Sequence, residues 1–147
     1  MAHDDPVDIP RVVFERVSAL CLALPEVTVR FDQSRVEWRS AAYSFDVRRR
    51  SFCLLIATAD TSGTAVPRIV LRVHPDDRDT LVSIGHPYYP SRAGPDRVAV
   101  LLTSDTDWTE IGELITESYR LLAPKKLAAT LDTNPTTWHP RTSESGA

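Results

Sequence analysis

The chain has 147 residues, 42% of them hydrophobic, which is enough for one ordinary domain with a buried core. Its 17 Lys and Arg residues oppose 20 Asp and Glu residues, and this balance excludes a whole-chain basic field that would attract nucleic acid or an anionic membrane. The longest apolar run, residues 52–57, is too short to span a bilayer, and the start of the chain is acidic, so we expect a soluble, cytoplasmic protein with no membrane partner.

The first part of the chain predicts a helix followed by a short strand. Apolar residues recur at spacings of four, three and four within residues 9–24, which predicts a helix that Pro25 ends. Residues 27–31 alternate apolar and polar side chains, which is typical of an edge strand.

The middle of the chain predicts three further strands. Residues 43–47 and 52–57 alternate in the manner of strands, and Arg48–Arg50 separate them, so we expect a hairpin with an arginine tip. A glycine-containing loop follows, and residues 68–73 then alternate apolar side chains with arginines, which predicts the next strand.

Proline and glycine divide the segment that comes next. A helix over 75–84 has proline at its first position and acidic residues in its first turn, and Gly85 closes it. Residues 86–95 contain three prolines and predict an irregular loop, after which residues 97–103 give the last strand.

The strongest helix signal lies near the C-terminus. Asp107 caps a helix with one apolar stripe, and Glu110 completes a capping-box pattern. Pro124 cannot continue this helix and takes the first position of a second, short one. We therefore expect a single domain over 1–131 and a flexible polar tail over 132–147.

The order of these elements defines the fold class. It is helix, three or four strands, short helix, strand, long helix and short helix, with no βαβ alternation. We therefore expect an α+β fold in which an antiparallel sheet carries its helices on one face.

Three segments resemble a known family. They are Ala-Leu-Pro-Glu-Val at 23–27, Leu-Arg-Val-His-Pro-Asp-Asp-Arg at 71–78 and, most specifically, Ser-Tyr-Arg-Leu-Leu-Ala-Pro-Lys-Lys-Leu at 118–127. Over residues 10–131 the chain resembles the MmcQ/YjbR-like family of small bacterial proteins. The resemblance implies a fold similar to bacterial frataxin (CyaY-like) and DNA binding through a double-wing arrangement of hairpins.

Positive charge gathers at the predicted hairpin tip. Guanidinium groups offer a planar fork that suits phosphate oxygens, and a protruding hairpin can lie along a duplex backbone. Lysines at a helix start oppose the helix dipole, so a phosphate or an acidic partner would explain them. The predicted nucleic-acid-binding residues are Arg48, Arg49, Arg50, Arg72, Lys125 and Lys126, with Arg35, Arg39 and Arg68 as candidate neighbours on adjacent strands.

The alternative for these residues is structural. The arginines then form a solvated turn and pair with acids such as Glu37 and Asp46, while the lysine stems cover apolar atoms.

The proline-rich loop is the second candidate site. Its members are His86, Tyr88, Tyr89 and Arg92. Its tyrosines are suited to stacking on bases or closing a pocket, which would make the loop a contact for a ligand or a partner. The alternative is that the tyrosines pack the loop onto the sheet.

Signals for catalysis and for metal binding are missing. The chain has no Gly-x-Ser-x-Gly elbow, no glycine-rich phosphate loop and no His-Glu-x-x-His, and its four histidines are isolated. Cys21 and Cys53 lie in apolar surroundings without ligand spacing, so we expect buried reduced thiols. We therefore expect a protein that is not an enzyme and uses no cofactor or metal.

Two functions remain open from the sequence. The first is weak, sequence-independent DNA binding through the arginine hairpin, assisted by the two lysines. The second is an interaction module for a protein or a small ligand, which would use the open face of the sheet or the tyrosine loop.

Overall fold

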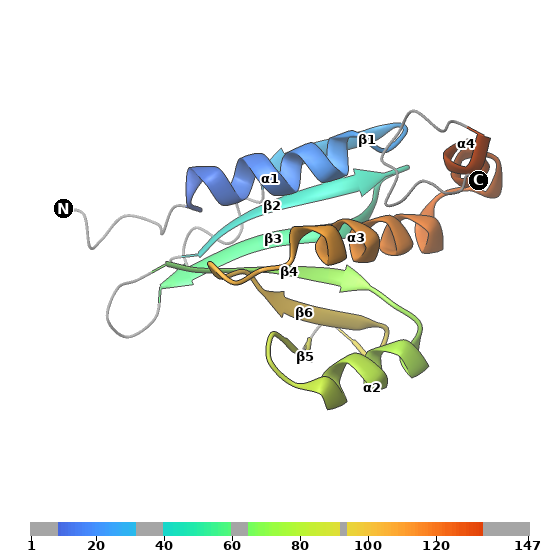
Figure 1. Ribbon diagram of the computed structural model, residues 1–147. Coiled ribbons are helices and arrows are strands. Elements are labelled where there is room, and N and C mark those ends of the chain that lie inside the picture. The colour runs from blue at the N-terminus through green and yellow to red at the C-terminus, as the bar shows by residue number, and fades with distance from the viewer. Residues whose placement is uncertain (1–8, 32–39, 60–64, 92–93, 134–147) are drawn as a thin grey trace.

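The computed structural model describes residues 9–31, 40–59, 65–91 and 94–133 (Figure 1). Its elements in chain order are α1 (Arg11–Leu22), β1 (Val27–Phe31), β2 (Ser40–Val47), β3 (Arg50–Ala59), β4 (Ala65–Arg72), α2 (Pro75–Ile84), β5 (Tyr88–Pro90), β6 (Arg97–Leu101), α3 (Trp108–Leu122) and α4 (Lys125–Thr133). The six described strands form one sheet in the order β1-β2-β3-β4-β6-β5, and every neighbouring pair is antiparallel. The predicted α+β class with an antiparallel sheet is confirmed, and β1 lies at an edge as predicted.

The core lies between one face of the sheet and the helices. A cross-strand row of fully buried residues crosses its centre, namely Phe45, Cys53, Leu71 and Val98. Val17 of α1 and Ile115 of α3 close over the same face, and α1 and α3 lie side by side on it in Figure 1. Burying each large apolar side chain contributes about 1.5–3 kcal/mol, so this layer accounts for much of the stability. Cys21 and Cys53 are both buried and free, as predicted.

The long helix α3 begins as its sequence predicts. The backbone N–H groups of Thr109 and Glu110 donate to Oδ1 of Asp107 at 3.1 and 3.3 Å, which satisfies two of the unpaired donors at the helix start. The Glu110 carboxylate, which we expected to complete the capping box, accepts the hydroxyl of Tyr88. Glu110 therefore fastens the loop before β6 onto α3.

The second C-terminal helix, α4, begins one residue later than predicted. Pro124 precedes the helix, and its carbonyl accepts the N–H of Ala128 at 2.9 Å. The helix continues to Thr133, and residues 134–147 of the predicted tail lie outside the described residues.

The segment 86–95 contains a strand, so the prediction of a wholly irregular loop is wrong. Tyr88–Pro90 pairs with Val98–Val100, and the Leu101 N–H donates to the Pro87 carbonyl at 2.9 Å. The proline that ends this strand is tolerated because β5 is the outer edge of the sheet, where a missing N–H breaks no ladder bond. Gly85, with φ of 90°, closes α2 as predicted. Among the described residues, no helix combines the length and apolar character needed to cross a membrane.

Candidate functional site

The arginine hairpin forms as predicted, with a two-residue turn. β2 ends at Val47, β3 begins at Arg50, and Arg48 and Arg49 between them have φ of 49° and 68°. A two-residue hairpin turn with both φ values positive matches the twist of its strands, and it favours Asn-Gly. A residue that carries a Cβ pays about 1–2 kcal/mol for this conformation. The two arginines therefore occupy positions where their backbone is disfavoured.

A third residue with positive φ contacts this turn. Glu26 has φ of 60°, and the Val27–Val47 register pair places it next to Arg48. Nε of Arg48 donates to Oε1 of Glu26 at 2.7 Å, and this hydrogen bond lowers the pKa of the Glu26 carboxyl. In the part of the chain that the structure describes, these three are the non-glycine residues with positive φ. Left-handed backbone is thus concentrated at one charged cluster, and such concentrations are typical of functional sites.

Further arginines lie beside the turn on β4 and β6. Arg72 and Arg97 are directly paired in the β4–β6 register. Burial lowers the pKa of Arg72, and the nearby charges of Arg97 and Arg50 lower it further, whereas Asp96 opposes this shift. Asp96 lies 3.3 Å from Nη1 of Arg72 and balances part of the charge. Like charges opposite one another destabilise a sheet, so an anion bound here would relieve repulsion.

Arg97 was missed by the sequence analysis. It directly follows the proline-rich loop, and nothing in the nearby sequence indicates that it will pair with Arg72 on the neighbouring strand. Arg49 and Arg50, by contrast, were predicted, and both are exposed. Among the described residues no carboxylate forms a salt bridge with either of them.

The lysines lie at the same end of the molecule. Figure 1 shows the β2–β3 turn, the end of β4 and the α3–α4 junction at one end of the sheet. Lys125 and Lys126 are exposed in the first turn of α4. The hydroxyl of Tyr119, near the end of α3, donates to the Pro25 carbonyl at 2.8 Å and so ties α3 to the chain just before Glu26. The element ends that carry the six predicted binding residues therefore lie at one end of the sheet.

The candidate neighbours are placed differently. Arg68 pairs with Ile56 and Leu101 in the middle of the sheet, away from the hairpin tip. Arg35, Arg39 and Glu37 lie outside the described residues. The structural alternative considered Asp46 as an arginine partner. Asp46 is buried, and its Oδ2 accepts a hydrogen bond from Nε of Arg30 at 2.9 Å.

The family-like motif at 118–127 has a structural role at this end. A bulge in the β2–β3 ladder leaves Phe52 without a register partner, because Phe45 pairs with Cys53. The Ser118 hydroxyl donates to the Phe52 carbonyl and accepts the Arg72 N–H at 2.9 Å. A single buried side chain thus satisfies two backbone groups and positions the strand ends that carry Arg50 and Arg72.

The tyrosine loop is partly built into the core. Tyr88 is 7% exposed, and burial together with its hydrogen bond to Glu110 raises the pKa of its hydroxyl. Tyr89 is half-buried opposite Ala99, and His86 is exposed. Arg92 lies outside the described residues. The surface of this loop therefore offers His86 and part of Tyr89, while the Tyr88 hydroxyl is already engaged.

Comparison with known proteins adds one finding. A family model described as YjbR matches residues 22–121, from the last residue of α1 to the last turn of α3. No curated protein and no solved structure matches the chain. Within the described residues, no group of three or more His, Cys, Asp or Glu side chains is placed to hold a metal ion.

Proposed function

The chain belongs to the YjbR family, and from this premise we propose that its hairpin end binds the phosphate backbone of DNA, weakly and without sequence preference. The protein acts in this proposal as a binding module and not as an enzyme. The binding residues are Arg48, Arg49 and Arg50 of the hairpin, with support from Arg72, Arg97, Lys125 and Lys126.

One observation carries the proposal. Arg48 and Arg49 occupy the two positive-φ positions of the turn, where Asn-Gly would stabilise the hairpin. A disfavoured residue type at such a position is explained when its side chain has a task outside the fold. Exposed guanidinium groups at a turn can reach phosphate oxygens, which supports backbone contact.

The charge distribution favours backbone contact over base recognition. Contacts to phosphate carry no sequence information, and arginine supplies the planar donors that phosphate oxygens accept. The net charge of the chain is −3, so attraction depends on this local cluster and is strongly weakened by salt. Weak binding that depends on ionic strength is therefore expected.

The test compares two charge-neutralising variants by fluorescence anisotropy with labelled duplex DNA at low salt. Arg49→Gln/Arg50→Gln removes two exposed charges at the hairpin, and Arg11→Gln/Arg16→Gln removes two exposed charges from α1 as a matched control. We expect the hairpin variant to bind about tenfold more weakly, because each exposed charge contact contributes about 0.2–1 kcal/mol, the loss of two costs up to about 2 kcal/mol, and about 1.4 kcal/mol corresponds to a factor of ten. Equal losses of DNA affinity in both variants would show that binding depends on the overall charge and not on the hairpin, which would overturn the proposal.

A further inference from the structure

Strand β1 forms one edge of the sheet. It pairs with β2 on one side, and in the described sheet no strand lies on its other side. The backbone N–H and C=O groups along such an edge can pair with a further strand, and natural edges commonly carry lysine, proline or a bulge that prevents this. The sequence of β1 is Val-Thr-Val-Arg-Phe, and its ladder with β2 runs without a register shift. β1 therefore keeps the geometry that a further strand needs.

Apolar side chains are exposed along this edge. Val29 and Phe31 are each 38% exposed. The Phe31 ring lies 5.2 Å from that of Tyr43, and the Phe14 ring of α1 lies 4.6 Å from Tyr43, so this side of α1 lies next to β1. Leu22 follows Phe14 by eight residues, about two helical turns, and is also exposed. Leu22, Val29 and Phe31 thus form an exposed apolar strip.

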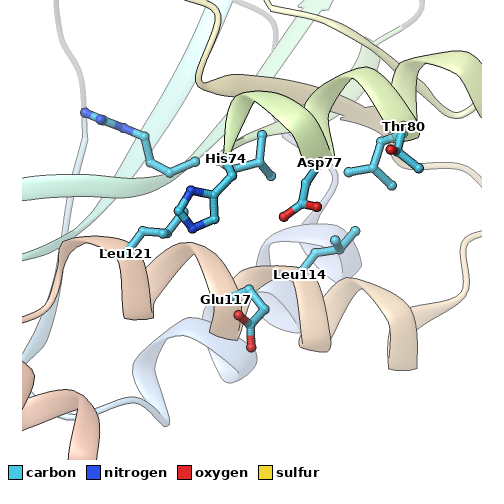
Figure 2. Close-up of a pocket in the computed structure, with 9 residues that line it drawn as sticks. His74, Asp77, Thr80, Leu114, Glu117 and Leu121 are labelled. Carbon is cyan, nitrogen blue, oxygen red and sulfur yellow. The ribbon is translucent and has the colours of Figure 1, made fainter.

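A second exposed apolar side chain group is different in character. Leu121 lines a pocket of about 240 Å³ between α2 and α3, together with polar and charged residues. Figure 2 shows Asp77 and Glu117 among the side chains that surround this pocket. The strip at β1 is the surface where apolar side chains and unpaired strand backbone coincide.

The charge that β1 carries is balanced within the chain. Its one charged residue is Arg30, whose Nε donates to Oδ2 of Asp46 at 2.9 Å. Arg30 and Thr28 lie on the face of the sheet opposite Val29, because successive side chains of a strand alternate between faces. The side of β1 that carries Val27, Val29 and Phe31 is therefore uncharged and meets no repulsion from an identical surface.

The sequence of β1 matches its own copy in antiparallel pairing. A two-fold axis at Val29 places Val29 opposite Val29 of the second copy, Phe31 opposite Val27, and Arg30 opposite Thr28. This axis position pairs all five residues of the strand. An axis at Arg30 would place two arginines opposite each other, and like charges in that position destabilise a sheet.

We propose that two copies of this chain associate edge to edge through β1, about a two-fold axis at Val29, and join their sheets into one. Leu22 of α1 borders the contact on the helix-covered face. The contact uses none of Arg48, Arg49 and Arg50, so it does not rest on DNA binding. It is built on one five-residue strand, and interfaces below about 1,200 Å² are typically weak, so the dimer should dissociate on dilution.

The test is sedimentation velocity over a hundredfold range of protein concentration, up to about 1 mM, where even weak association is populated. We expect the wild type to change from monomer to dimer across this range. Val29→Lys should weaken association about fivefold or more, because the two introduced charges lie opposite each other. Ile84→Lys adds the same charge at an exposed apolar position of α2 and should associate as the wild type does.

A mixing experiment tests the position of the axis. Val29→Glu alone should associate as weakly as Val29→Lys, whereas an equimolar mixture of the two should form a heterodimer, because opposite charges then face each other. Circular dichroism verifies that each variant is folded, as expected for a position that is already exposed. A wild type that stays monomeric up to about 1 mM, a folded Val29→Lys that associates normally, or a folded mixture that stays monomeric would each overturn the proposal.

Discussion

Nε of Arg48 lies 2.7 Å from Oε1 of Glu26, and both residues have left-handed backbone, with φ of 49° and 60°. The pair joins the turn before β1 to the tip of the β2–β3 hairpin. It also places a carboxylate on one of the guanidinium groups that the proposed DNA contact would use. In the proposed DNA contact, Glu26 would therefore compete with phosphate for Arg48.

Replacing Glu26 by glutamine should strengthen DNA binding about twofold to threefold, because the variant frees Arg48 and removes a negative charge at the surface. Anisotropy titrations at low salt measure the change. Glu15→Gln is the matched control, since Glu15 accepts Arg11 at 3.1 Å in a comparable exposed pair on α1. An equal gain in the control, or a loss of affinity in Glu26→Gln, would show that Glu26 does not compete at this site.

The turn sequence can be exchanged to separate charge from folding. Arg48→Asn/Arg49→Gly installs the residues that the positive φ values favour, but it also removes the Arg48–Glu26 ion pair and asparagine keeps part of the backbone cost, so the free energy of unfolding should rise by only about 1 kcal/mol. DNA affinity should fall in the same protein, because two guanidinium groups are lost. Urea unfolding and anisotropy measure the two effects. If the variant is more stable and still binds DNA with the affinity of the wild type, DNA binding does not explain why arginine occupies the turn.

The Ser118 hydroxyl should be essential to the fold. In Ser118→Ala the Arg72 N–H and the Phe52 carbonyl both lose their partner in a buried place, which should lower the free energy of unfolding by about 2–4 kcal/mol. Thr116→Ala is the control, because the Thr116 hydroxyl only returns to the Gly112 carbonyl within the helix. Denaturant unfolding distinguishes the two. If both variants lose only a little free energy of unfolding, water takes over the hydrogen bonds of the Ser118 hydroxyl.

Tyr119 should make stability depend on alkaline pH. Burial, with a smaller contribution from Glu26, raises the pKa of its hydroxyl to about 12, against about 10 in the unfolded chain. The folded state thus favours the neutral hydroxyl, so this contribution is complete below pH 10 and is lost as the pH rises through 12. At pH 11 the loss should be about 1 kcal/mol. Tyr119→Phe should lack this loss of unfolding free energy when urea midpoints at pH 8 and pH 11 are compared. An identical loss in the wild type and the variant would show that other groups cause it.

The elements with strong local signals were predictable. Asp107 could be predicted as the cap of α3 because its side chain accepts hydrogen bonds only from backbone N–H groups two and three residues later in the chain. The tip at Arg48 and Arg49 was visible because polar residues interrupt two alternating runs. The strand at Tyr88–Pro90 was not predictable, since its three residues are surrounded by prolines and its pairing with β6 depends on the sheet already being formed.

The candidate site was predictable only in part, because its remaining members meet through long-range pairing. Arg97 reaches Arg72 through the β4–β6 register, and Ser118 reaches Phe52 across 66 residues of sequence. The pocket between α2 and α3 likewise depends on how two helices approach each other, which their separate periodicities do not specify.

The measurement that tests the central claim most directly is the salt dependence of duplex binding, for the wild type and for Arg49→Gln/Arg50→Gln. For phosphate contacts, the logarithm of the binding constant falls against the logarithm of salt concentration with a slope of about −0.9 per phosphate neutralised. We predict such a slope for the wild type, and a slope shallower by about 1.8 for the variant, which loses two contacts. Equal slopes for the two proteins, or no binding of the wild type at low salt, would contradict a DNA-binding role for the hairpin end.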